Sequence, residues 1–106
     1  MPTAVELKST LIRRRRGKVL RLLQSAAPMA LPDADDLYRL LQDTGESLTI
    51  YEVHELVRDL KQRGCMAYEA KRDRNNELPT LRWLRLEPRG RDVIEGTIQD
   101  PAIDVI

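Results

Sequence analysis

Apolar residues recur with helical spacing over the first quarter of the chain. Thr3 followed by Glu6 is a capping-box pattern, which predicts a helix beginning near Ala4. Its apolar positions are Val5, Ile12, Val19, Leu20 and Leu23, with Leu7 and Leu11 forming a narrower second stripe. We expect the helix to end before Pro28. The segment 27–32 is predicted to be a connector, because its prolines lack backbone donors and bias the preceding residues away from the helical region.

Two shorter helices are predicted next. Asp33 is suited to cap the first of them, and Gly45 is suited to end it. Thr49 with Glu52 repeats the capping box and begins the second, which we expect to end at Gly64. The apolar stripes are Leu37, Leu40 and Leu41 in the first, and Val53, Leu56 or Val57, and Leu60 in the second.

Beyond the third helix the hydrophobic period changes from 3.6 to 2, which indicates strands. Residues 66–70 and 80–86 alternate between apolar and polar positions around the polar turn 71–77, which predicts a β-hairpin. In the second strand, Leu81 and Trp83 are assigned to one face, and Arg82, Leu84 and Leu86 to the other. Pro88 begins a short final helix that continues through Ile94.

This order of elements predicts an α+β fold, a winged helix-turn-helix made of a three-helix bundle, a two-stranded β-hairpin wing and a short C-terminal helix. The chain has 106 residues, 42% of them hydrophobic, so one small core and one domain are expected over residues 1–106. Within it we assign a core at about 10–96, an N-terminal helical extension at 1–9 and a C-terminal tail at 99–106.

Composition excludes several kinds of site. One cysteine permits no intramolecular disulfide and no cysteine-based zinc site, and one histidine permits no His-rich metal site. Cys65 is expected to be a small buried hydrophobe, and His54 has no partner set for nucleophilic catalysis. Without a membrane-length apolar stretch or a signal peptide, we expect a cytoplasmic, cofactor-free protein that is not an enzyme.

The formal net charge of +1 conceals a segregation of charge along the chain. Residues 8–21 carry seven basic residues and no acid, a charge of +7. Residues 33–59 carry −6, and residues 61–92 carry +4. Such a chain is able to present a basic face to a polyanion despite its nearly neutral total, although neighbouring basic and acidic helices would neutralise each other equally well.

Three stretches carry a family resemblance. Residues 48–66 resemble the third helix of winged helix-turn-helix proteins, with its closing leucine, polar residues and glycine. Residues 84–92 resemble the exit from the second wing strand, where a Leu-x-Leu pattern is followed by Arg-Gly. The end of the chain, from Arg89-Gly90 to Asp100-Pro101, is similar to the close of small winged-helix proteins of Mu-like phages and prophages. The resemblance implies a DNA-binding fold, and the function we expect is that of a phage- or prophage-type transcriptional regulator.

In such a fold the third helix enters the major groove. The candidate contacts to double-stranded DNA are Tyr51, His54 and Arg58 on that helix, Lys71, Arg72 and Arg74 on the wing, and Arg13, Arg14, Arg16 and Lys18 on the first helix. Four consecutive arginines spread around a helix, so one or two are expected to face the bundle and to need carboxylates from the acidic second helix. The third helix is neutral from Glu52 to Arg63, which counts against conventional base readout.

Two questions about partners stay open at this point. The extension before Ile12 and the apolar tail of Ile103, Val105 and Ile106 would suit a homodimer, although the tail would equally suit a frayed end. Trp83 is either a core residue or a contact to another chain. The alternative function is a protein-interaction or assembly module of a phage-like element, which uses the same fold without specific DNA binding.

Overall fold

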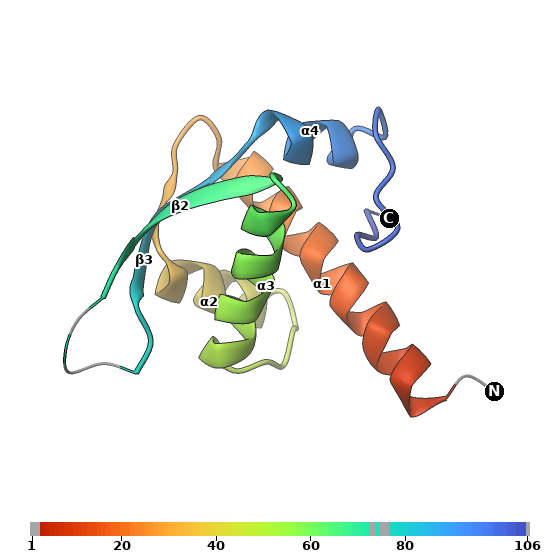
Figure 1. The fold of residues 1–106 in the computed structure, drawn as a ribbon, viewed down its shortest axis with the longest axis horizontal. Coiled ribbons are helices and arrows are strands. Elements are labelled where there is room, and N and C mark those ends of the chain that lie inside the picture. Colours follow the sequence, from red (N-terminus) through yellow and green to blue (C-terminus); the bar gives the residue numbers. More distant parts are fainter. Residues whose placement is uncertain (1–2, 73, 75–76, 106) are drawn as a thin grey trace.

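The computed structural model describes residues 3–72, 74 and 77–105, and its fold is α+β (Figure 1). Within that range, four helices pack with one three-stranded antiparallel sheet. The elements, in chain order, are α1 (Ala4–Ala26), β1 (Leu31–Asp33), α2 (Ala34–Asp43), α3 (Ile50–Gln62), β2 (Met66–Lys71), β3 (Thr80–Leu86) and α4 (Pro88–Ile94). The predicted turn positions 73, 75 and 76 and the tail residue Ile106 lie outside the described residues.

The helix boundaries follow the local signals in the sequence. Both predicted capping boxes form: the side chain of Thr3 accepts from the backbone N–H of Glu6 while Glu6 accepts from that of Thr3, and Thr49 and Glu52 do the same in α3. Asp33 caps α2 through its side chain. Each cap satisfies backbone donors that the first turn of a helix leaves unpaired, so these ends are set by residues close in sequence.

The core lies between the helices and the inner face of the sheet. Its buried members include Val19, Leu20 and Leu23 of α1, Leu37 and Leu41 of α2, Val53, Leu56, Val57 and Leu60 of α3, and Leu81 and Leu84 of β3. Three positions of the predicted apolar stripes are exposed. Val5 and Leu7 are 77% and 58% exposed, because the first turns of α1 extend beyond the rest of the molecule (Figure 1), and Leu40 is 36% exposed on the outer side of α2.

Part of the predicted connector is a strand. β1 pairs antiparallel with β3, with Leu31 opposite Leu84 and Asp33 opposite Arg82, so the strand order of the sheet is β1-β3-β2. Pro32 does not prevent this pairing, because β1 is an edge strand and a proline there lacks only one donor. The connector prediction is therefore wrong for Leu31 and Pro32.

β3 contains a bulge that overturns the predicted faces of this strand. The cross-strand pairs on either side of it are Ala67 with Arg85 and Glu69 with Arg82. Two residues of β3, Trp83 and Leu84, therefore lie opposite the single residue Tyr68. Leu81 and Leu84 both face the core, whereas Trp83 has a positive φ of 58° and is 46% exposed. Trp83 is thus not a core residue.

The C-terminal segment packs on α1 of the same chain. Ile103 is buried in the core, and the backbone N–H of Asp104 donates to the carbonyl of Arg13 at 3.0 Å. A Cβ atom at Gly17 would overlap the carbonyl oxygen of Asp104, so the glycine permits this close approach. The described part of the tail is therefore not frayed, and Ile103 is not on the surface to pair two subunits.

Candidate nucleic-acid interface

The arginine run of α1 is largely engaged within the molecule. The carboxylate of Glu46, in the turn between α2 and α3, lies 3.1 Å from Arg15 Nε, 3.2 Å from Lys18 Nζ and 3.4 Å from Arg14 Nη2. Glu46 and Arg15 are both buried, at 6% and 7% exposure. Burial acts to raise the pKa of Glu46, but the hydrogen bonds from Arg15 and Lys18 outweigh it, so that pKa lies below its usual value.

Two arginines of α1 also form ion pairs with carboxylates of α3. Arg15 Nη1 lies 3.2 Å from Glu52, and Arg16 Nη2 lies 3.1 Å from Asp59. The prediction that inward arginines need carboxylates is confirmed. The predicted source is wrong, because these carboxylates come from α3 and from Glu46 in the α2–α3 turn rather than from the second helix.

The pairing separates the charges of α3 onto two faces. Glu52 and Asp59, seven residues apart, lie on the side that meets α1. The outermost face presents Tyr51, Glu55, Arg58 and Gln62, which follow each other at helical intervals and are exposed. Two of the three acids that make α3 neutral are therefore turned toward arginines of α1, and only Glu55 remains on the outer face.

Lys61 extends the basic side of α3 toward the hairpin. Its Nζ atom lies 4.4 Å from the ring centroid of Tyr68 on β2, within cation–π distance. Burial raises the pKa of the Tyr68 hydroxyl, and the positive charge of Arg58 partly opposes this. From the sequence, Lys61 is only a cation in the last turn of the helix, where positive charge suits the helix dipole. Its position three residues after Arg58 is the available signal in the sequence, but the contact with Tyr68 depends on how β2 packs beside α3.

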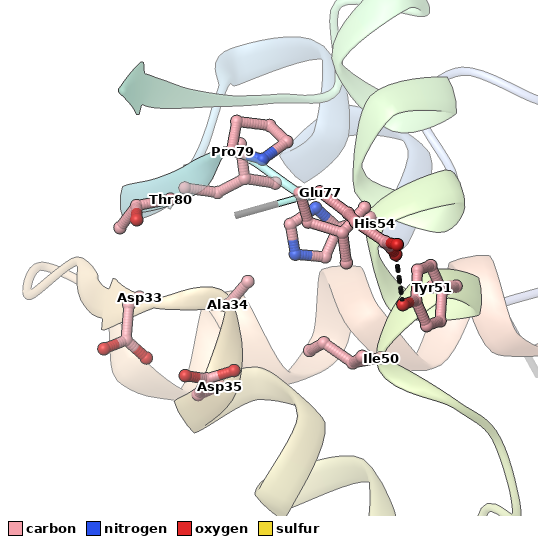
Figure 2. Close-up of a pocket in the computed structure, with 11 residues that line it drawn as sticks. Asp33, Ala34, Asp35, Ile50, Tyr51, His54, Glu77, Pro79 and Thr80 are labelled. Atoms are coloured by element: carbon pink, nitrogen blue, oxygen red, sulfur yellow. Dashed lines mark hydrogen bonds between the residues drawn. The ribbon is translucent and has the colours of Figure 1, made fainter. Parts of the chain in front are cut away.

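The hairpin is attached to the start of α3 by a side-chain hydrogen bond. Tyr51 donates from its hydroxyl to Glu77 at 2.9 Å, which raises the pKa of the Tyr51 hydroxyl (Figure 2). Beside this bond is a pocket of about 440 Å³, whose wall includes Asp33 and Asp35 at the start of α2.

His54 points into this pocket rather than outward (Figure 2). Burial lowers its pKa, and the nearby Asp35 carboxylate partly opposes this, so the ring is neutral at neutral pH. The side chain therefore lines the pocket between α3 and the hairpin, and a direct contact to DNA through His54 is not favoured by this geometry.

The predicted wing contacts are all on the surface. Lys71, Arg72 and Arg74 are exposed, at the end of β2 and in the turn beyond it. The hairpin and the first half of α1 extend on opposite sides of α3 (Figure 1). The candidate DNA contacts thus fall into two groups, one on α3 and the hairpin and another on α1, where Arg13 also donates to Thr10.

Two further predictions concern Cys65 and metal binding. Cys65 is fully buried as predicted, and burial raises its pKa. Within residues 3–72, 74 and 77–105, no group of three His, Cys, Asp or Glu side chains is placed to hold a metal ion. No helix in that range is both long and apolar enough to span a bilayer. No protein-family model, curated protein or solved structure matches the chain.

Proposed function

We propose that this protein is a cytoplasmic, non-catalytic winged-helix protein that binds double-stranded DNA, as a transcriptional regulator of the phage or prophage type. The order of its elements is compatible with that fold. α2 and α3, joined by the short turn 44–49, correspond to the helix-turn-helix, and the β2–β3 hairpin corresponds to the wing.

The observation that carries the proposal is the partition of charge on α3. The net charge of this helix is zero between Glu52 and Arg63. If all these charges faced the same partner, this neutrality would favour an interaction module over a DNA-binding protein. Glu52 and Asp59 instead pair with α1, which leaves Arg58 and Lys61 against Glu55 on the surface that a duplex would meet. A net positive outer face is what phosphate contacts need.

In the proposed complex, Tyr51 and Arg58 approach base edges in the major groove, and Lys61 approaches a phosphate. The wing residues Lys71, Arg72 and Arg74 contact phosphates along the neighbouring DNA strand. Four further predicted contacts are left out, because they lie on α1, on the other side of α3 from the hairpin: Arg13, Arg14, Arg16 and Lys18. Among them, Arg16 pairs with Asp59, and together with the Arg15–Glu52 pair it holds α1 against α3 and keeps these two acids turned inward.

The wing contacts give the first prediction. The double variant Arg72→Ala/Arg74→Ala is expected to bind a mixed-sequence duplex about tenfold more weakly at low salt, with the salt slope of log K reduced by about 2, because two phosphate contacts are lost. Fluorescence anisotropy with a labelled duplex at several salt concentrations measures both quantities.

The matched control is Arg39→Ala/Arg91→Ala. It removes the same charge from exposed positions on α2 and α4, away from the proposed interface, and should leave both the affinity and the slope nearly unchanged. Wild-type protein that binds no duplex at low salt, or an affinity indifferent to ionic strength, would contradict the proposal.

Glu55 gives a second prediction. It is exposed on the outer face of α3 and has no ion pair to another described residue. Its carboxylate is repelled by phosphates unless it accepts from a cytosine amine. Glu55→Gln is therefore expected to strengthen binding to mixed-sequence DNA about three- to tenfold, through removal of one repulsive charge. Glu95→Gln on the surface at the end of α4 is the control, and equal affinities for the two variants would argue against α3 as the contact helix.

A further inference from the structure

A basic groove of about 800 Å³ lies between the exposed half of α1 and the C-terminal segment 99–102. Five cationic side chains line it: Lys8, Arg13 and Arg16 from α1, Arg63 at the end of α3, and Arg89 from α4. Apolar atoms of Val5 and Ile12 lie among them. The groove therefore combines positive charge with exposed apolar surface, which is suited to an acidic partner that also carries an apolar side chain.

Carboxylates within the groove do not balance these cations. Its one acidic lining residue is Asp100, whose carboxylate accepts from Arg63 Nη1 at 3.3 Å and lies 3.9 Å from Arg89 Nη2. Arg16 is paired with Asp59 outside this lining, yet its Nε atom is buried without a hydrogen-bond partner among the described residues. Arg16 Nη1 also donates to the carbonyl of Ala102 at 3.2 Å, and its Nε atom is buried, so Arg16 contributes positive charge to the groove rather than a free donor.

A surface complementary to this basic groove, with acidic residues on either side of an exposed leucine, lies on the outer side of α2. Asp36, Leu40 and Asp43 follow each other at intervals of four and three residues and so form one stripe. Leu40 is 36% exposed, although its spacing is that of a core position. No hydrogen bond or ion pair joins the carboxylates of Asp36 or Asp43 to another described residue. The stripe is an apolar centre with two available negative charges.

We propose that the groove of one molecule receives α2 of a second copy of this chain. Leu40 would lie on Val5 and Ile12, while Asp36 and Asp43 would pair with cations of the groove. A molecule does not fill its own groove in this way, because α2 and the C-terminal segment lie on opposite sides of α3 (Figure 1). The contact is therefore head-to-tail, and such contacts produce rings or open chains of subunits.

Charge supports this occupant over an unrelated one. The basic segment 8–21 and the acidic segment 33–59 nearly cancel within one chain, and the total charge of +1 gives little long-range repulsion between copies. One short helix in a groove buries less area than a stable dimer interface, so we expect weak, salt-sensitive assembly. This proposal does not depend on DNA binding.

The test is sedimentation velocity of the full chain over a range of concentrations. Wild-type protein should show a weight-average mass that rises above one chain at low salt, and the rise should be suppressed when the ionic strength is raised to about 0.5 M, where the Debye length is short. Lys8→Glu/Arg13→Glu and Asp36→Lys/Asp43→Lys should each remain monomeric. Far-UV circular dichroism checks that both fold, and Asp43→Lys alone replaces the second variant if Asp36→Lys weakens α2.

Two combinations make the test specific. An equimolar mixture of the two variants should regain self-association, because the intact α2 of one fits the intact groove of the other and the two charge-reversed surfaces also complement each other. The chain carrying all four substitutions should regain self-association, since both charges are reversed together. Monomeric wild-type protein at the highest concentration, or a mixture that stays monomeric, overturns the proposal. So does a groove variant that loses affinity for duplex DNA while wild-type protein stays monomeric, because the groove would then serve DNA.

Discussion

Glu46→Ala is expected to lower the free energy of unfolding by about 3 kcal/mol, which is the low end of the cost of breaking a buried ion pair. The substitution leaves the buried guanidinium of Arg15 without its closest carboxylate and removes the shared partner of Arg14 and Lys18. The cost stays at the low end because Arg15 keeps Glu52 and the carbonyl of Ser47. Urea denaturation followed by circular dichroism measures the effect.

The control is Arg14→Ala. Its side chain is 59% exposed, so removal of this outer partner of Glu46 should cost at most about 1 kcal/mol. The pH dependence gives a second readout. The folded-state pKa of Glu46 is lowered, so its contribution is present above the ordinary carboxyl pKa and is lost as the pH falls through the lowered value. The stability of the Ala variant should therefore fall less steeply in acid, and parallel acid profiles would show that Glu46 is not the stabilising carboxylate.

Gly90→Ala is expected to destabilise the fold by about 2 kcal/mol, within the usual cost of forcing an extra methyl group into a packed position. A Cβ atom there would overlap the carbonyl oxygen of Cys65 and approach Leu86 closely. The same carbonyl accepts from the backbone N–H of Glu87, so it is held in place between the start of β2 and the start of α4. Alanine favours a helix by about 1 kcal/mol over glycine, so the measured loss is what remains after that gain.

Arg91→Ala is the matched control, because it lies next to Gly90 in α4 but is exposed, and it should change stability by less than about 0.5 kcal/mol. Thermal unfolding of the two variants, followed by circular dichroism, compares their stabilities. If Gly90→Ala is as stable as Arg91→Ala, α4 shifts freely relative to β2.

The elements that could be predicted are those whose signals are local. Thr3 with Glu6, and Thr49 with Glu52, fix helix starts through bonds between residues three apart, and the apolar spacing of α3 selects its buried face correctly. β1 depends instead on pairing with a strand about fifty residues later, and three residues around a proline contain no periodicity to reveal it. The bulge at Trp83 likewise depends on the register of a partner strand.

The candidate site could be predicted in part, because some of its features also depend on local signals. Exposure of Lys71 and Arg72 follows from the polar turn, and the need of inward arginines for carboxylates follows from the cost of burying charge. The identity of the carboxylates that pair with these arginines depends on tertiary packing. The seven-residue spacing of Glu52 and Asp59 does place them on one side of α3, but only the packing of α1 against that side removes them from the outer face.

Trp83 has a practical consequence for optical experiments on this protein. It is the only tryptophan, and the bulge turns it to the outer side of the sheet, where nearly half of it meets water. Its emission in the folded state should already resemble that of a solvated indole, so fluorescence is a poor reporter of unfolding. A blue shift on addition of a ligand would instead locate that ligand on the outer side of the sheet.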